Sequence, residues 1–65
     1  MFVIVNGQTH PLPESRTLAA LLLSLSPPAP FAVARNEDVV PRETYEDCCI
    51  YPGDRIDIVH PTAGG

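Results

Sequence analysis

The sequence predicts an α+β fold in which one helix packs on a mixed sheet of four or five strands. Three observations support this prediction: an Asn6-Gly7 pair between two short extended runs, a stripe of leucines with helical spacing, and an apolar alternation near residue 57. The length of 65 residues suits one domain, and a chain of this size buries only about 60% of its unfolded surface. An enclosed active site is therefore not expected, and a binding module or a carried substrate fits better than an enzyme.

An N-terminal hairpin is predicted first. Phe2–Val5 is apolar and rich in β-branched residues, and the Asn6-Gly7 pair that follows is a strong signal for a tight turn. The segment 8–12 can return as the second strand. Because Pro11 and Pro13 lack backbone donors, this strand is expected at an edge of the sheet.

A single helix is predicted next, with Thr17 as its N-cap and an end near Leu25. Its apolar residues fall at i, i+3, i+4 and i+7 and form one stripe: Leu18, Leu21, Leu22 and Leu25. The proline-rich stretch 26–30 ends the helix, since proline removes a backbone donor and restricts the residue before it.

The remaining elements are expected to be short. In chain order they are a strand over 31–35, a turn over 36–38, a pairing segment at 39–40, weak helical character over 41–49, a turn over 52–54 and a last strand over 55–59. Ile56 and Ile58 lie on one face of that last strand.

The first and last strands can pair in parallel across the helix, which is the β-grasp pattern of ubiquitin-like proteins. We expect a β-grasp domain over 1–59 and a flexible C-terminal tail over 60–65 that ends in Gly-Gly. The residues expected to be buried are Val3, Val5, Leu18, Leu21, Leu22, Leu25, Ile56 and Ile58.

The net charge of the chain indicates which classes of partner it can bind. The net charge is -4, and the four basic residues are all arginine and form no basic run. Phosphate contacts need lysine or arginine, so the composition argues against nucleic acid and favours a basic protein surface. The longest apolar run, Leu18–Leu23, is too short to cross a bilayer, and no signal peptide is recognised.

Cys48 and Cys49 are adjacent, with Cα atoms about 3.8 Å apart, which is too close for ordinary disulfide geometry. This suits a reducing cytoplasm, where we expect the protein to reside. Together with His10 and His60 they do not match a zinc spacing. Cys49 is expected in the core and Cys48 at the surface, and no metal or cofactor is expected to bind.

The chemistry is expected at Gly64 and Gly65. Glycine has no Cβ atom, so a narrow channel of a partner can pass it and reach the carboxylate of Gly65. The tail from His60 can extend by roughly 20 Å while the domain docks outside. A flexible end with no role is the simpler reading of two glycines, but their place after a β-grasp pattern favours the functional one.

A docking patch is predicted on the sheet. If Val3 and Val5 face the helix, then Phe2 and Ile4 face outward, and Val59 would join them from the neighbouring strand. Scattered surface apolarity is the competing explanation.

At this point the sequence resembles the sulfur carrier family of thiamin biosynthesis, the ThiS family, over nearly its whole length. The matching segments are Asn6-Gly7, Thr17-Leu18 with Leu21-Leu22, Val33-Ala34-Arg35-Asn36, Val40-Pro41-Arg42, Tyr45, Gly53-Asp54-Arg55-Ile56 and Ala63-Gly64-Gly65. Arg35 stands where that family more often has an apolar residue.

The resemblance implies a route for sulfur. A ubiquitin-activating-type adenylyltransferase would use Mg-ATP to convert the Gly65 carboxylate to an acyl-adenylate. A persulfide would displace AMP to leave a thiocarboxylate, which gives its sulfur to thiazole synthase. ATP and Mg would belong to the adenylyltransferase, and the chain itself would be a co-substrate and not an enzyme.

Two alternatives stay open. The chain could carry sulfur for molybdopterin or another metabolite, or act as a ubiquitin-like conjugator. It could instead be a β-grasp interaction module with no carrier role, which would tolerate the loss of Gly65.

Overall fold

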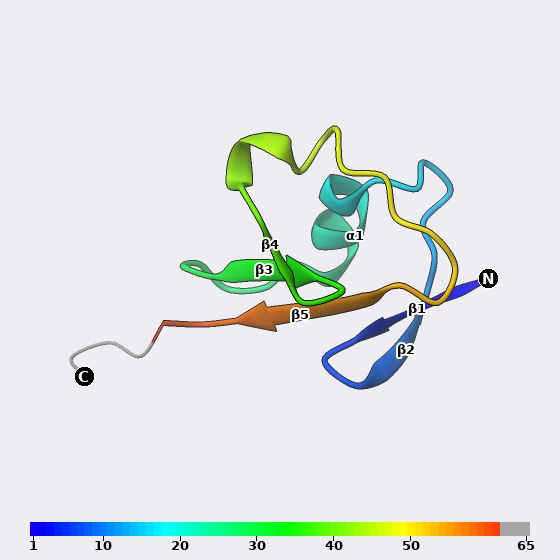
Figure 1. Ribbon diagram of the computed structural model, residues 1–65, viewed down its shortest axis with the longest axis horizontal. Coiled ribbons are helices and arrows are strands. Elements are labelled where there is room, and N and C mark those ends of the chain that lie inside the picture. Colours follow the sequence, from blue (N-terminus) through cyan, green and yellow to red (C-terminus); the bar gives the residue numbers. More distant parts are fainter. Residues whose placement is uncertain (62–65) are drawn as a thin grey trace.

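The computed structural model describes residues 1–61 and contains one helix, one short 3₁₀ helix and five strands in that range. In chain order the elements are β1 (Phe2–Val5), β2 (Gln8–Pro11), α1 (Leu18–Leu25), β3 (Ala32–Arg35), β4 (Asp38–Val40), η1 (Arg42–Thr44) and β5 (Arg55–Val59). The strands form one sheet in the order β2-β1-β5-β3-β4, and α1 lies across one face of it (Figure 1). The predicted β-grasp α+β fold is confirmed.

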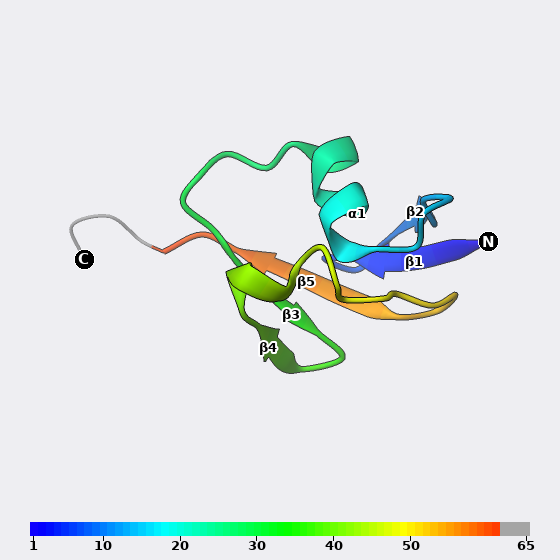
Figure 2. The same ribbon diagram turned by 90° about the horizontal axis from the view of Figure 1, so that it is seen from above.

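Strand β5 lies at the centre of the sheet, between β1 and β3 (Figure 2). It pairs with β1 in parallel, with Ile4 opposite Arg55 and Val5 opposite Ile56, as predicted for the first and last strands. On its other side it is antiparallel to β3. Strand β2, which contains Pro11, is an edge strand, also as predicted.

Both hairpins turn through two residues in the left-handed region. Asn6 and Gly7 have φ values of 48° and 82°, and Asn36 and Glu37 have φ values of 49° and 75°. Positive φ at both central residues is the requirement of the tight turns whose twist matches a hairpin. The second turn is shorter than predicted, because Asp38 already belongs to β4.

Helix α1 has the predicted start and end. The Thr17 hydroxyl accepts a hydrogen bond from the Ala20 amide at 3.2 Å, which satisfies one of the free N–H groups of the first turn. At the other end Ser26 adopts φ 48°, and its amide donates to the Leu22 carbonyl at 2.8 Å. Within the described residues, no helix is both long and apolar enough to pass through a membrane.

The core lies between α1 and the sheet and contains seven of the eight residues predicted to be buried: Val3, Val5, Leu18, Leu21, Leu22, Ile56 and Ile58. Leu25, the last residue of α1, is only partly buried. Val33 and Ile50 are buried as well and were not predicted.

The segment before Ile50 corrects the prediction for the cysteines. The helical character expected over 41–49 is limited to η1 and the turn over 45–47, and Cys49 then forms a bridge with Thr17. Alternate residues of an extended segment point the same way, and Ile50 is fully buried. Cys48 therefore packs against the core and Cys49 is exposed, the reverse of the prediction.

Replacing Ile50 tests this description of the core. Ile50→Val should lower the free energy of unfolding by about 1 kcal/mol, because it removes a buried methyl group that the surroundings cannot fully replace. Leu23→Ala is the control: it removes more carbon, but Leu23 is 80% exposed, so the change should stay within about 0.5 kcal/mol. Urea unfolding measures both, and equal losses would contradict the placement of Ile50.

Candidate functional site

The candidate site begins where β5 ends. Val59 is the last residue of the strand, and His60 and Pro61 follow it outside any helix or strand. The ring of His60 meets the ring of Phe31 edge to face, with centroids 6.5 Å apart and planes at 63°. This contact joins the first residue after β5 to the segment that leads into β3. Gly64 and Gly65, the predicted reacting end, lie outside the described residues.

The predicted docking residues do face outward, on the side of the sheet opposite α1. In β1, Val3 and Val5 are buried, Phe2 is 58% exposed and Ile4 is partly exposed. In β5, Val59 is also 58% exposed. The alternation inferred from the sequence therefore holds in both strands.

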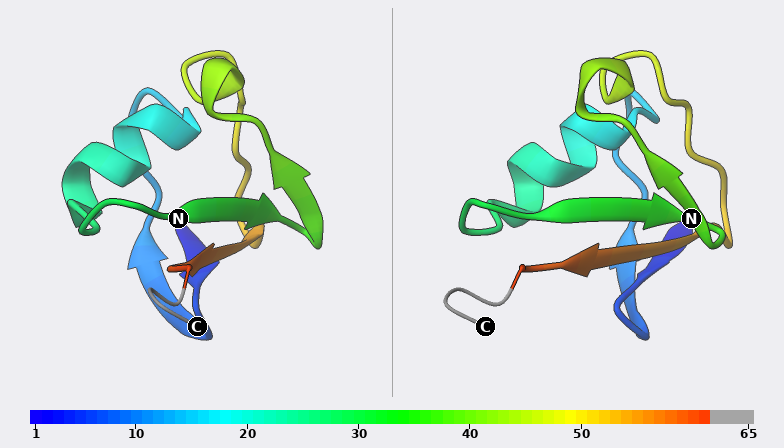
Figure 3. Two further views of the ribbon diagram at one scale, coloured as in Figure 1. Left: turned by 90° about the vertical axis from the view of Figure 1, so that its left-hand side faces the viewer. Right: turned by 60° about the vertical axis from the view of Figure 1, so that its left-hand side comes forward.

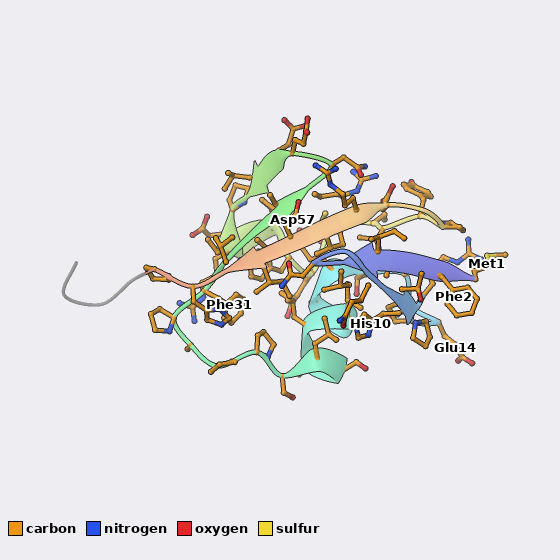
Figure 4. The ribbon with its side chains drawn as sticks, turned by 90° about the horizontal axis from the view of Figure 1, so that it is seen from below. Met1, Phe2, His10, Glu14, Phe31 and Asp57 are labelled. Carbon is orange, nitrogen blue, oxygen red and sulfur yellow. The ribbon has the colours of Figure 1, made fainter. Side chains whose placement is uncertain are left out.

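The structure does not bring these three residues together. The residue opposite Ile4 is Arg55, so Val59 lies four residues further along β5. At about 3.3 Å per residue this separates Val59 from Ile4 by roughly 13 Å along the strands, and from Phe2 by roughly 20 Å. Figure 4 shows Phe2 at one end of the outer face and Asp57 partway along β5. The expectation that Val59 joins Phe2 and Ile4 was wrong, because it ignored the stagger of the two strands.

Val59 instead belongs to a second apolar group. Its direct partner in β3 is Ala32, and two positions along the same face Ala34 lies opposite Val39 of β4. Val39 is 78% exposed. We call Ala32, Ala34, Val39 and Val59 the tail-side patch. Sequence reasoning missed its other members, although in the pair Val39-Val40 one residue had to point outward if the other packed inward.

A second outward group surrounds Phe2, and charged residues separate the two. Phe2 lies opposite Pro11, and with Ile4 these residues form what we call the N-terminal patch. Between the patches Arg55 contacts Asp57, with 3.5 Å between Nε and Oδ2, and Glu37, with 3.1 Å between Nη2 and Oε1. The outer face therefore offers a partner two apolar areas divided by ion pairs.

Asp54 organises the turn before β5. Its carboxylate accepts hydrogen bonds from Arg35 Nε at 2.8 Å, Asn36 Nδ2 at 3.2 Å and the Tyr51 amide at 2.8 Å. Burial by itself would raise the pKa of Asp54, but these hydrogen bonds outweigh it, so the pKa lies below its ordinary value. The guanidinium of Arg35 also lies over the Tyr51 ring, 5.6 Å from its centroid. The arginine at a usually apolar position is thus paired and stacked.

An open groove on the helix side is lined by residues of α1 and of the segment that contains η1. Figure 3 shows that both of these segments lie on the same side of the sheet. It has a volume of about 500 Å³, and its apolar lining includes Leu22, Leu23, Phe31 and Tyr45, with Arg42 and Glu43 among its charged residues.

Among residues 1–61, no three histidine, cysteine or acidic side chains gather where they could hold a metal ion.

Fold and site together define a small β-grasp protein whose central strand leads directly into the segment with the two glycines. The chain belongs to the ThiS family: the model of that family matches residues 3–65 and so includes both glycines.

Two relatives and one solved structure extend the comparison. Proteins called thiazole synthase from Magnetococcus marinus and Paramagnetospirillum magneticum are 38% and 33% identical to this chain over 66 aligned positions that cover all of it. The chain spans about a fifth of the length of these relatives. The crystal structure of a thiamine biosynthesis protein (ThiS) from Geobacter metallireducens matches over the full length of both chains with a TM-score of 0.83 and 23% identity, which supports the fold.

The Asp54 cluster predicts a pH-dependent contribution to stability. Because the pKa of Asp54 is lower in the folded protein than in the unfolded chain, its ionised form stabilises the fold. That contribution is complete above the unfolded pKa of about 4 and is lost as the pH falls through the folded pKa. Asp54→Asn should therefore cost about 1–2 kcal/mol near pH 7 and progressively less below about pH 4.

Urea unfolding across pH measures this difference. Asp47→Asn serves as the control, because Asp47 is exposed and its side chain has no ion pair among the described residues. Its effect should stay within about 0.5 kcal/mol. A loss in Asp54→Asn that does not change with pH would contradict the proposed role of the carboxylate.

Proposed function

We propose that this chain is a sulfur carrier for thiamin thiazole synthesis and that its reacting group is the α-carboxylate of Gly65. The observation that carries the proposal is the family match, which runs through Gly65 on a fold whose central strand leads into the glycine segment. Membership in the ThiS family supports the carrier role. The domain then supplies recognition, and the catalytic groups belong to its partners.

The chemistry follows from a carboxylate as the starting group. A carboxylate oxygen attacks the α-phosphate of Mg-ATP on a ubiquitin-activating-type adenylyltransferase, and pyrophosphate leaves. The terminal sulfur of a persulfide then displaces AMP from the acyl-adenylate. A thiol cleaves the resulting acyl disulfide and leaves Gly65 as a thiocarboxylate. Sulfur is a better nucleophile than the carboxylate oxygen that it replaces, so the product can deliver it.

The length of the tail and its two glycines suit the delivery of the Gly65 carboxylate to a partner's active site. Residues 60–65 span roughly 20 Å when extended, which allows the body to dock outside a channel while Gly65 reaches the nucleotide. Glycine at the last two positions removes the side chains that a narrow channel would exclude. We propose that 1–59 acts as the docking body and 60–65 as the delivery segment.

Thiazole synthase is the proposed acceptor of the sulfur. Two relatives that cover all of this chain bear that name and are five times as long, which supports a thiazole synthase as the protein to which a domain of this kind delivers. The net charge of -4 favours partners whose docking surfaces are basic.

We further propose that the outer sheet face docks on the adenylyltransferase and that the tail-side patch is the main contact. Val59 directly precedes the tail, so the tail-side patch is the part of the outer face that lies nearest to a partner that binds the tail. Phe2 and Ile4 lie at the other end of the face and add a second, weaker contact.

Two aspartate variants test the docking surface. Val39→Asp should weaken binding to the adenylyltransferase at least tenfold, because it places an unpaired charge in an apolar contact. Phe2→Asp should weaken it less. Calorimetric titration gives both affinities, and both sites are exposed, so the fold should survive. Unchanged affinity in Val39→Asp would rule out the tail-side patch.

The position of the carboxylate is tested by changing the chain end. Deletion of Gly65 withdraws the carboxylate by up to about 3.5 Å, and a misplacement of 1 Å can cost about a hundredfold in rate. Addition of one alanine after Gly65 replaces that carboxylate by an amide. Neither change should affect folding.

The measurement is intact mass after incubation with the adenylyltransferase, Mg-ATP and a persulfide donor. The unchanged chain should gain the mass of one oxygen-to-sulfur exchange in its C-terminal peptide, and the two variants should not. Equal charging of the extended chain, or sulfur on Cys48 or Cys49, would show that the proposal is wrong.

A further inference from the structure

Strand β5 extends beyond the end of its parallel partner. The register of β1 and β5 covers Ile4 with Arg55 and Val5 with Ile56, and β1 then turns away into β2 at Asn6 and Gly7. The last backbone bond from this side is donated by the Asn6 amide to the Ile56 carbonyl, at 2.9 Å. On that edge the backbone of β1 therefore leaves the final residues of β5 without a neighbouring strand.

The side chain of Asn6 takes the place of the missing strand. The Ile58 amide donates to Asn6 Oδ1 at 2.8 Å, and Asn6 Nδ2 donates to the Ile58 carbonyl at 3.2 Å. In a parallel ladder one strand accepts from and donates to the same residue of its neighbour. A single carboxamide thus makes both bonds that a longer β1 would have made, and it extends the ladder by one residue.

This places the last anchor of the body immediately before the tail. On the other edge of β5, Asp57 and Val59 pair with Ala34 and Ala32 of β3, so the strand is held from both sides up to Ile58. Val59 has a partner only in β3, and His60 follows. Without the Asn6 carboxamide, the end of β5 would be held from one side only.

We infer that Asn6 is a positioning residue for carboxylate activation. Its carboxamide fixes the base of the tail, and so sets where the delivery segment leaves the docking body. This inference rests on the proposed carrier function and adds a residue that lies far from Gly65 in sequence. Loss of the carboxamide removes the bonds that hold Ile58 on the β1 side, so the direction in which the tail leaves the body is less well fixed and the reaction slows. Val59 keeps its partner Ala32 in β3, so the docking surface is retained.

Asn36 provides a matched control within the same chain. It is also the first residue of a tight hairpin turn, with φ 49° against 48° for Asn6. Its side chain also binds the backbone of β5: the Arg55 amide donates to Asn36 Oδ1 at 2.9 Å. Asn36 holds the start of β5, where its Nδ2 also donates to Asp54, whereas Asn6 holds the end of the strand.

The experiment compares Asn6→Gly and Asn36→Gly in the full chain. Glycine accepts the positive φ of either turn, so both variants keep the hairpin and lose only the carboxamide. Three quantities are measured: amide hydrogen exchange at Ile58 and Arg55, binding affinity for the adenylyltransferase, and kcat of carrier-dependent exchange between ATP and pyrophosphate. Affinity reports docking, while kcat at saturating carrier reports the placement of the carboxylate.

Asn6→Gly should show faster exchange at Ile58, an affinity within about twofold of the unchanged chain, and a kcat about tenfold lower. Asn36→Gly should show faster exchange at Arg55 and an unchanged kcat. A normal kcat in Asn6→Gly, an equal fall in Asn36→Gly, or a loss of affinity in place of kcat would overturn the inference while the carrier function stands. If the unchanged chain supports no exchange at all, the carrier function itself fails and the inference fails with it.

Discussion

The hydrogen bonds along strand β5 are the constraint on which the rest of the structure depends. The strand lies in the centre of the sheet and joins the N-terminal hairpin on one side to the β3–β4 hairpin on the other. Without it the two hairpins share no backbone bond in the described sheet, and Ile56 and Ile58 leave the core. The Asp54 cluster at its start and the two turn asparagines support this one strand, so local interactions that look unrelated in sequence converge on it.

Because the chain is small, we expect its functional residues on the surface and in the tail and not in an enclosed pocket. The described core is one layer of aliphatic side chains between α1 and the sheet, and no polar side chain is buried in residues 1–61. A chain this small cannot enclose a pocket and keep that layer. What remains available is the outer sheet face, an open groove beside the helix and the segment after Val59.

Sequence patterns predicted the elements well because each depends on local chemistry. Asn6-Gly7 requires a tight turn, Thr17 caps the helix, and the spacing of the leucines decides which side of α1 is buried. Long-range geometry was less accessible. The stagger between β1 and β5 follows from where β1 turns away, and it separates Val59 from Phe2 although alternation alone suggested one patch.

The cysteines show a second kind of limit. Weak helical character over 41–49 predicted Cys49 one turn from Tyr45, whereas Cys49 forms a bridge with Thr17 and the next residue, Ile50, is buried. The role of the Asn6 side chain was hidden in a different way. The tight turn already explains why asparagine stands at position 6, and the hydrogen-bond partner Ile58 lies 52 positions away in the sequence.

The parallel arrangement of β1 and β5 also has a mechanical consequence. Residue Met1 and the end of β5 lie on opposite sides of the molecule (Figure 1). A pull on the tail against the N-terminal part of the body therefore acts along the two strands, in shear. The bonds between Ile4, Asn6 and β5 share this load and do not open one after another, as they would in a pair of strands peeled from one end. The fold can thus be held under tension at its tail and keep its shape.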